Sequence, residues 1–307
     1  MEYKSPLVCI IVLNWNGCEV SEPCLQSISQ IDYDNYNVVL VDNGSIDGSG
    51  EKLKEKFNCN DKIHFLLLDK NYGFTGGNNI GIKYAVQKWN PSFVLLLNND
   101  TIVNSNFLSI MVNAFADKSC YAIVPKILCL DQPEKVLFAG GSVSKWTGNV
   151  KNYGYGKKDS EIFNIQQYTS FMNGCCALLS AECIQNIGLL DDRFFASSED
   201  ADYSLRILKS GHKIKYAPQS VIYHKVHYSF KANKGKWLTF YLGTRGIILL
   251  QKKHLPRKYL PIFISLFFIR WTLYLTFKLL MMKDLKSIKG LYVGFFDGIT
   301  NKIRYVI

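Results

Sequence analysis

Short apolar runs alternate with stretches of helical spacing over the first hundred residues, and this alternation constrains the fold more than any other feature. Four runs of strand length are almost wholly apolar, which is typical of strands covered on both faces. Three stretches rich in helix-forming residues lie between them. The β-α-β-α order predicts an α/β fold with a parallel, doubly wound sheet flanked by helices. The expected strands are residues 7–13, 38–41, 63–68 and 93–97, and the expected helices are residues 20–29, 48–57 and 76–89.

Conspicuous polar residues stand directly after three of the four apolar runs. In an open parallel sheet, ligands bind in the crevice outside the carboxyl ends of the strands. Side chains that follow different strands are therefore expected to gather in one cleft. The residues concerned are Asn14 and Asn16 after the first run, Asp42 and Asn43 after the second, and Asn98, Asn99 and Asp100 after the fourth.

The rest of the chain gives weaker structural signals. Residues 120–167 mix short strands with glycine and lysine, and we interpret them as mainly loops. A helix is expected from about residue 200 to 210, ending before Gly211, because glycine commonly terminates helices. The apolar run at residues 7–13 is too short for a secretory signal. The nine cysteines show no zinc-finger spacing, so we expect reduced, mostly buried thiols in a cytosolic protein.

The net charge of +11 is very unevenly distributed along the chain. Residues 1–204 hold 16 lysines and arginines against 23 acidic residues, a net charge of −7, whereas residues 205–307 hold 20 against 2, a net charge of +18. Such asymmetry predicts that the C-terminal third meets an anionic partner. Nucleic acid and an anionic membrane surface are the two candidates.

The stretch at residues 260–282 favours the membrane. It is mainly apolar and aromatic but contains Arg270 and Lys278, and further lysines and arginines flank it. Its length would permit a membrane-spanning helix, but the cations favour a helix that lies in the headgroup interface or re-enters it. A buried helix is the third alternative. Because this region has no recognisable nucleic-acid motif, we expect a membrane surface and no nucleic acid as its partner.

Asp100 and His224 are the candidate metal ligands. A carboxylate at a strand end suits Mg²⁺ or Mn²⁺, which prefer oxygen ligands and keep phosphates as partners. The alternative for Asp100 is a capping residue in an asparagine-rich turn. His224 could add a neutral imidazole, although a lone histidine is more often structural and the nearby His227 could compete for this role.

Glu199 and Asp200 are the candidate catalytic residues. They lie in a run of three carboxylates within five residues, which raise one another's pKa and so suit a general base. The alternative is acidic charge that stabilises the start of a helix.

A glycine-rich stretch at residues 73–79 precedes a predicted helix. Its members Gly76, Gly77 and Asn78 could bring backbone N–H groups close to a phosphate at the helix N-terminus. The stretch has neither the G-x-G-x-x-G pattern nor a P-loop lysine, which weighs against nicotinamide cofactors and ATP.

Taken in order, these motifs resemble the inverting, GT-A-fold glycosyltransferases of family 2, particularly the rhamnosyltransferase-like branch of bacterial polysaccharide assembly. Each motif alone is weak, but the ordered set covers roughly residues 7–228 and is highly specific. The matching stretches are residues 12–17, 41–48, 71–79, 97–101, 173–176, 190–195, 199–202 and 221–224.

The resemblance implies a GT-A (Rossmann-like) nucleotide-sugar domain over residues 1–230, and the charge and apolar composition predict a basic, apolar, membrane-associating helical region over residues 231–307. It also implies that Asp42 binds the nucleotide base, with residues 14–16 in the same pocket. The donor-binding residues predicted in this way are Asn14, Asn16, Asp42, Asn43, Gly76, Gly77, Asn78, Asn98 and Asn99.

The family's catalytic and metal positions fall on residues already singled out. Asp200 resembles the catalytic base of its Glu-Asp motif, which includes Glu199. Asp100 resembles the metal-binding aspartate of its D-x-D element, and His224 the position that often completes the metal or diphosphate site. The first aspartate of D-x-D is Asn98 here, which removes one negative charge near a metal that we expect to be Mn²⁺ or Mg²⁺.

The reaction implied is transfer of a sugar, with inversion, from a nucleotide-diphosphate donor to a hydroxyl group. The donor expected is dTDP-rhamnose, with UDP-sugars as the alternative, and the acceptor expected is a lipid-linked glycan. The chain would then lie in the cytoplasm, peripheral on the inner face of the cell membrane. A nucleotidyltransferase is an alternative, but residues 7–17 lack its glycine-rich, basic signature. A non-catalytic, membrane-bound nucleotide-sugar binding protein would not require Asp100, Glu199 and Asp200.

Overall fold

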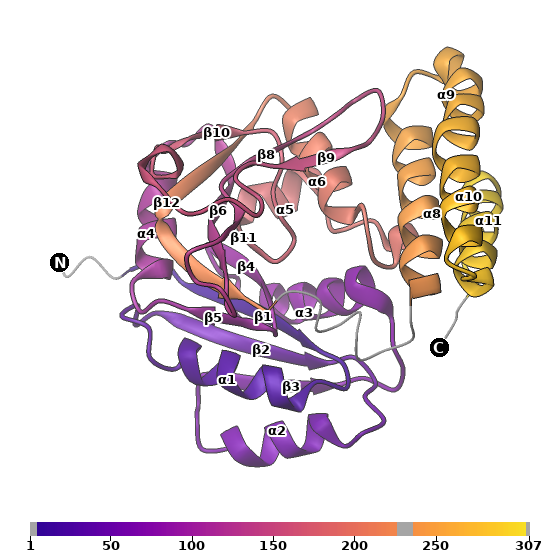
Figure 1. Ribbon diagram of the computed structural model, residues 1–307. Coiled ribbons are helices and arrows are strands. Elements are labelled where there is room, and N and C mark those ends of the chain that lie inside the picture. Colours follow the sequence, from indigo (N-terminus) through magenta and orange to yellow (C-terminus); the bar gives the residue numbers. More distant parts are fainter. Residues whose placement is uncertain (1–4, 226–235, 305–307) are drawn as a thin grey trace.

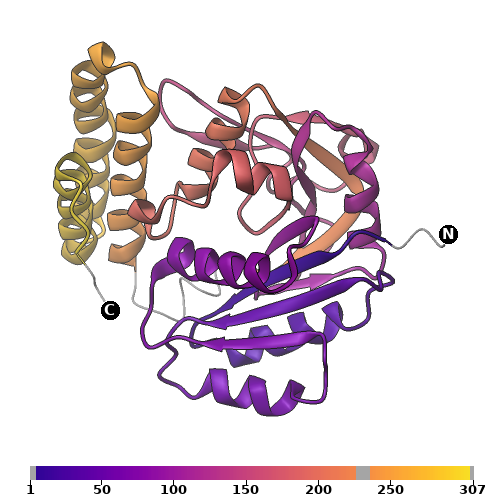
Figure 2. The same cartoon turned by 180° about the vertical axis from the view of Figure 1, so that it is seen from behind.

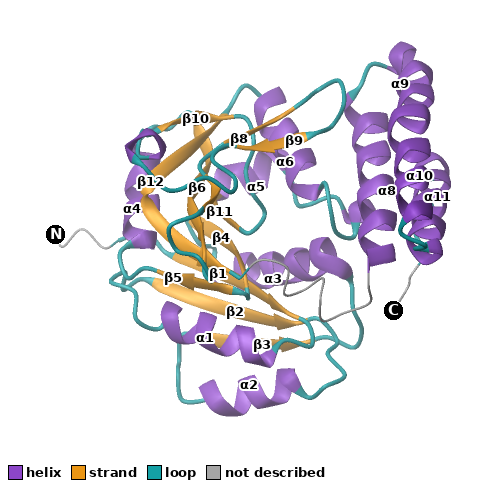
Figure 3. Ribbon diagram, viewed as in Figure 1, coloured by secondary structure: helices purple, strands orange, loops and turns teal. Residues whose placement is uncertain are grey.

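The computed structural model describes residues 5–225 and 236–304, and Figure 1 shows a sheet flanked by helices with a further group of helices beside it. Within these residues the main sheet has the strand order β10-β12-β6-β11-β4-β1-β2-β3, with β5 beside β12 and β7 beside β6. A separate hairpin pairs β8 with β9. Figure 3 colours the same view by secondary structure and separates the strand-rich part from the helical part.

The first half of the chain has the predicted alternation of strands and helices. The strands β4, β1, β2 and β3 pair in parallel, and α3 covers the face opposite α1 and α2 (Figures 1 and 2). Both faces are covered, which explains why the strand sequences are continuously apolar. The bounds are β1 (Val8–Asn14), α1 (Cys18–Ile28), β2 (Tyr36–Asp42), α2 (Ser49–Phe57), β3 (Ile63–Leu67), α3 (Gly73–Trp89) and β4 (Phe93–Asn98).

The parallel register brings the ends of these strands to one edge of the sheet. Asn14 at the end of β1 pairs with Asp42 at the end of β2, and Leu13 pairs with Asn98 at the end of β4. The predicted α/β sheet is therefore confirmed, and the polar residues that follow its strands share an edge.

The second half of the sheet is mixed, because β11 is antiparallel to both β4 and β6 whereas β12 runs parallel to β6. The helix expected near residues 200–210 is confirmed as α6. The bounds in this part are β5 (Thr101–Val103), α4 (Phe107–Asn113), η1 (Ala114–Ala116), β6 (Cys120–Cys129), β7 (Val136–Phe138), β8 (Gly141–Val143), β9 (Val150–Asn152), η2 (Glu161–Phe163), β10 (Gln167–Thr169), β11 (Cys176–Ser180), α5 (Ala181–Ile187), η3 (Asp192–Phe194), α6 (Glu199–Lys209) and β12 (Lys213–His224).

The interpretation of residues 120–167 as mainly loops is wrong for β6, a ten-residue strand buried in the sheet. Pro125 and Lys126 interrupt its apolar pattern, so the sequence does not indicate a strand here. Lys126 is nevertheless only 4% exposed, because its ammonium group forms an ion pair of 2.9 Å with Asp159. A partner 33 positions away cannot be recognised from the local pattern, so a buried lysine looks like a loop lysine.

The C-terminal helices pack beside the sheet, with α8 nearest to it (Figure 1). The domain boundary expected between residues 230 and 231 lies outside the described residues. The helices are α8 (Lys236–His254), the short η4 (Arg257–Tyr259), α9 (Leu260–Phe267), the π-helical η5 (Phe268–Leu273), α10 (Tyr274–Met281) and α11 (Leu285–Thr300).

One continuous helical segment, Arg257–Met281, is long and apolar enough to cross a membrane. Only 6% of its most apolar 18-residue stretch is buried against the rest of the chain. The alternative of a buried core helix for residues 260–282 is therefore wrong. Length and composition allow both an interfacial and a spanning helix.

Three glycines on α11 lie directly against α8. A Cβ atom on Gly290 would lie 2.3 Å from the carbonyl oxygen of Trp237, and one on Gly294 would lie 2.4 Å from that of Tyr241. One on Gly298 would lie 2.9 Å from Cβ of Ile248. Small residues at every fourth position allow two helices to approach closely, so α8 and α11 form a tightly packed pair.

Candidate active site

One cavity opens at the edge of the sheet where the parallel strands end. Its volume is about 920 Å³. Its walls come from the ends of β1, β4 and β12, the start of α3, the segment before α6, the β8–β9 hairpin and α8. All four predicted catalytic and metal-binding residues line it together: Asp100, Glu199, Asp200 and His224.

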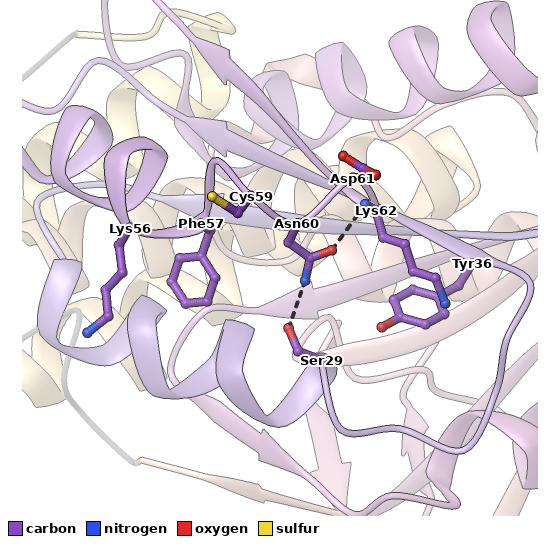
Figure 4. A pocket seen from close by; sticks show the side chains of 8 residues that line it. All are labelled: Ser29, Tyr36, Lys56, Phe57, Cys59, Asn60, Asp61 and Lys62. Atoms are coloured by element: carbon purple, nitrogen blue, oxygen red, sulfur yellow. Dashed lines mark hydrogen bonds between the residues drawn. The ribbon is translucent and has the colours of Figure 1, made fainter.

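A second cavity, of about 530 Å³, lies where β2 and β3 begin, at the opposite edge of the sheet. Figure 4 shows its side chains: Asn60 donates to Oγ of Ser29 at 3.3 Å and accepts from the backbone N–H of Lys62 at 3.1 Å. The Lys62 ammonium lies 4.2 Å from the ring centre of Tyr36. These groups satisfy one another and include none of the predicted site residues, so the larger cavity is the candidate site.

Asp100 and His224 meet in the larger cavity although 124 positions separate them. Asp100 lies in the turn between β4 and β5, and β12 pairs with β5 so that His224 stands opposite Thr101. His224 Nε2 lies 3.0 Å from Oδ1 of Asp100. Asp100 is only 5% exposed, and its Oδ1 accepts no hydrogen bond within the described residues.

This pair fits a site for a hard divalent cation. The described residues contain no group of three histidine, cysteine or acidic side chains that could enclose a metal. Mg²⁺ and Mn²⁺ do not need such an enclosure, because one or two protein ligands combine with water and substrate phosphates. A buried carboxylate oxygen with an imidazole nitrogen 3.0 Å away supplies two such ligands.

Glu199 and Asp200 begin α6 and line the same cavity. The backbone N–H groups of Ala201 and Gly174 donate to the Asp200 carboxylate at 2.7 and 3.4 Å. Burial raises the pKa of Asp200 above its ordinary value despite these donors. Burial and the neighbouring Asp200 charge raise the pKa of Glu199, whose Oε2 has no hydrogen-bond partner in the described part of the chain. A carboxylate with a raised pKa suits proton abstraction near neutral pH.

The turn that leads into these two carboxylates is strained. Phe195, Ser197 and Ser198 have φ angles of 64°, 77° and 72°, in the left-handed region that favours glycine. Each such residue costs about 1–3 kcal/mol and persists only where surrounding contacts hold it. One contact comes from α3, where the Thr75 N–H donates to the Phe195 carbonyl oxygen at 3.0 Å.

The predicted residues Asn14 and Asp42 are buried, Asn16 is partly exposed, and all three belong to a polar network beside the cavity without lining it. The Asp42 carboxylate accepts from Asn14 Nδ2 at 2.6 Å and from the Ser45 hydroxyl at 2.6 Å. Asn16 Oδ1 accepts from the backbone N–H of Ile46 at 2.9 Å. Their contacts hold the loops after β1 and β2, and their binding of a nucleotide base stays a prediction.

Asn43, Asn98 and Asn99 line the cavity as predicted residues of its strand-end wall. Asn43 Nδ2 donates to Oδ1 of Asn71 and to the Gly73 carbonyl oxygen, at 3.0 and 3.1 Å, and so ties the end of β2 to the start of α3. These contacts fix the wall from which a donor would be bound.

Gly76, Gly77 and Asn78 lie inside α3, which begins three residues earlier than expected, and they do not line the cavity. A Cβ atom on Gly77 would lie 2.4 Å from Cδ1 of Leu13, so this glycine lets α3 approach β1. The preceding Gly73 and Phe74 line the cavity instead. A phosphate role for the helix start stays a prediction, but these two residues are the ones placed to fulfil it.

Comparison with known proteins adds the family. Residues 9–188 match the profile of "Glycosyl transferase family 2", which is more than half of the chain. The chain belongs to glycosyl transferase family 2. The predicted family and the predicted glycosyltransferase enzyme class are thus confirmed, and the nucleotidyltransferase alternative is not supported.

Individual members and neighbours share low identity with this family 2 chain. It is 25% identical over 206 residues to the low-salt glycan biosynthesis hexosyltransferase Agl10 of Haloferax volcanii, covering 64% of this chain and 60% of that protein. It is 22% identical over 240 residues to the dTDP-rhamnosyl transferase RfbF of Shigella flexneri, covering 75% of each. The mannosyltransferase PcManGT from Pyrobaculum calidifontis, solved in complex with GDP-Man and Mn²⁺, superposes with a TM-score of 0.60 at 15% identity, covering 98% of this chain and 89% of that one. The structural likeness confirms the GT-A fold.

Sequence reasoning missed the C-terminal wall of the cavity. Leu238, Leu242 and Ile247 of α8 line it, and so does Trp271 of η5. The family match ends at residue 188, so this wall lies outside the matched region. The apolar residues within 236–254 could have indicated that this segment packs against the sheet domain. The basic charge of the whole region instead favoured a membrane contact as its role.

Proposed function

We propose that this chain transfers a sugar from a nucleotide-diphosphate donor to a hydroxyl group of a lipid-linked glycan at a membrane surface, with inversion at the anomeric carbon. The observation that carries the proposal is that the Asp100–His224 pair and Asp200 line the same cavity. A donor diphosphate requires cation ligands and an acceptor hydroxyl requires a base, and residues suited to both roles line this one cavity.

The donor class follows from the family, and dTDP-rhamnose is the first candidate. The similarity to a dTDP-rhamnosyl transferase over 75% of both chains supports it. UDP-sugars are the second candidate. Asn98 in place of an aspartate leaves the cation site with fewer negative charges, which suits a site completed by the diphosphate oxygens themselves.

In the reaction, the Asp200 carboxylate accepts the proton of the acceptor hydroxyl as its oxygen forms a bond to C1 of the sugar. The bond between C1 and the phosphate oxygen breaks on the opposite face, which inverts the anomeric centre. Asp100 and His224 would hold a divalent cation, which when bound stabilises the negative charge of the leaving nucleoside diphosphate. The N–H groups of Gly174 and Ala201 keep the base oriented toward the cavity.

The membrane part of the proposal rests on the exposed side of the helical segment Arg257–Met281. Its large apolar side chains recur at helical spacing and face away from the rest of the chain, and lysines and arginines flank them. An anionic membrane would accept both kinds of group. We expect a peripheral position on the cytoplasmic face. The exposed apolar residues include Ile262, Leu266, Ile269, Leu273, Tyr274, Phe277, Leu280 and Met281.

A donor screen tests this function. Purified protein is mixed with dTDP-rhamnose, UDP-sugars and GDP-sugars, each with Mn²⁺, with Mg²⁺ or with EDTA, and the thermal midpoint is measured. A ligand that binds the folded state raises the midpoint, and we expect one nucleotide class to do so only with metal. Donors that bind are then incubated with membrane lipid extract, and the anomeric configuration of the product is determined. Failure of every nucleotide sugar to bind, or a product with retained configuration, would contradict the proposal.

A further inference from the structure

The C-terminal helix α8 is attached to the strained turn that precedes the base. Arg245 of α8 is only 1% exposed, although it carries a permanent charge. Its Nη1 donates to the carbonyl oxygens of Arg193 and Phe194, at 2.7 and 3.5 Å, and its Nε donates to the Lys302 carbonyl oxygen at 2.7 Å. The buried guanidinium therefore donates hydrogen bonds to backbone carbonyl oxygens at the start of the turn.

The residue after Arg245 brings the two backbones into contact. A Cβ atom on Gly246 would lie 2.7 Å from the Ser197 carbonyl oxygen and 2.8 Å from Oγ of Ser198. Ser197 and Ser198 are two of the residues with positive φ angles. The glycine thus allows α8 to support the strained turn immediately before Glu199.

The same helix also holds the chain after the base. Asp202, which is fully buried, accepts from Lys253 Nζ at 2.8 Å and from His254 Nε2 at 2.7 Å. Lys253 also forms an ion pair of 2.7 Å with Asp191. One helix therefore contacts the polypeptide on both sides of Asp200, from Asp191 to Asp202.

We propose that Arg245 is a positioning residue for transfer: it fixes the turn from Arg193 to Ser198, and through that turn it sets the direction of the Asp200 carboxylate. This inference rests on the proposed function, in which Asp200 is the base. Arg245 itself is not among the residues that line the cavity, so its effect is expected on turnover rather than on donor binding.

The test compares Arg245→Met, Arg245→Lys and Tyr241→Phe. Tyr241 is the matched control, because it is buried on the same helix one turn earlier but donates to Asp297 of α11 at 3.1 Å and not to the turn. For Arg245→Met we expect kcat to fall by about 100-fold, since a small misplacement of a catalytic group costs about this much. Donor affinity should stay within about 3-fold. Arg245→Lys should be intermediate, because lysine keeps the charge without the planar fork.

A second measurement needs no substrate. Backbone hydrogen exchange over residues 191–203 should rise in Arg245→Met by about 10-fold or more and stay unchanged in Tyr241→Phe. If Arg245→Met does not fold, Gly246→Ala replaces it, because the added methyl group presses on the Ser197 carbonyl oxygen and should give the same pattern.

Unchanged kcat and unchanged exchange in the folded variant would overturn the proposal. So would a loss of donor affinity equal to the loss of kcat/KM, because Arg245 would then act on binding. Asp200→Asn separates this outcome from a wrong function: if that variant is inactive while Arg245→Met is fully active, only the positioning role is lost. If Asp200→Asn stays active, the base assignment itself fails.

Discussion

Residues 5–225 and the helices of residues 236–304 differ in which kind of side chain they bury and which they expose. In the first part, polar residues near the cavity such as Asn14 and Asp42 are buried and hydrogen-bonded to one another. In the second, large apolar residues such as Phe277 are exposed, that one by 67%. The first arrangement suits a small polar ligand enclosed by protein, and the second suits an extended apolar surface. The cavity lies between them and takes a wall from each.

The largest effect expected is on the carboxylate at the meeting point of the two parts. Asp200→Asn removes the proton acceptor and should lower kcat by about 1,000-fold, within the range for a general base. Donor affinity should be kept, which titration with the donor and Mn²⁺ would measure. Asp131→Asn, an exposed carboxylate after β6, serves as the control and should be fully active.

The pH dependence of the unmodified chain sharpens this prediction. Because burial raises the pKa of Asp200, its base form is lost as pH falls through a value above the ordinary range for aspartate, about 3.9. Turnover should therefore decline on the acid side at a higher pH than an exposed aspartate would give. An acid limb near the ordinary value would argue against the buried base.

The next largest effect is expected at the proposed cation ligands, which belong to residues 5–225 and not to the C-terminal helices. Asp100→Ala removes one of the two proposed cation ligands and should lower kcat/KM by about 100-fold, with donor binding that no longer responds to Mn²⁺. His224→Ala should do the same to a smaller extent. Isothermal titration with and without Mn²⁺ measures both, and donor affinity that still rises with Mn²⁺ in Asp100→Ala would remove that residue from the site.

A smaller effect is expected from the exposed side of α9 to α10. Phe277→Glu should weaken binding to vesicles of anionic phospholipid by about 10-fold or more, since burying a phenylalanine contributes about 1.5–3 kcal/mol. Ile162→Glu, at an equally exposed position on η2, is the control and should bind as the unmodified chain does. Co-sedimentation with the vesicles measures the difference, and equal losses in the two variants would mean that charge alone is responsible.

The smallest effect expected is on stability at the carboxylate beside the base. The folded state raises the pKa of Glu199, so it holds this proton more tightly than the unfolded chain does. That contribution is complete below the unfolded value of about 4.3 and is lost as pH rises through the raised value. Glu199→Gln mimics the protonated form. As pH rises, the free energy of unfolding of this variant should therefore fall by roughly 1 kcal/mol less than that of the unmodified chain. Urea unfolding at several pH values measures the slopes, and parallel slopes would show that Glu199 is not the titrating group.

The two parts also differ in how far the sequence predicts them. The strands β1 to β4 could be predicted because each is a continuous apolar run, and their polar ends because the parallel register gathers them at one edge. β6 could not, since Lys126 needs Asp159 to be buried, and that contact exists only in the folded chain. The position of Asp200 could be predicted from its motif, but the contact of Arg245 with the turn before it could not. Nothing in the pattern of α8 distinguishes a buried arginine from a surface one.

The glycines of α11 have a consequence for how this chain can vary. Gly290, Gly294 and Gly298 lie against the backbone or side chains of α8, and none of them lines the cavity. A methyl group at any of them would force the two helices apart. It would thereby shift α8, the helix that carries Arg245 and Lys253. Substitution here would then harm turnover from a distance, so a search for inactive variants would recover positions that contact neither sugar nor nucleotide.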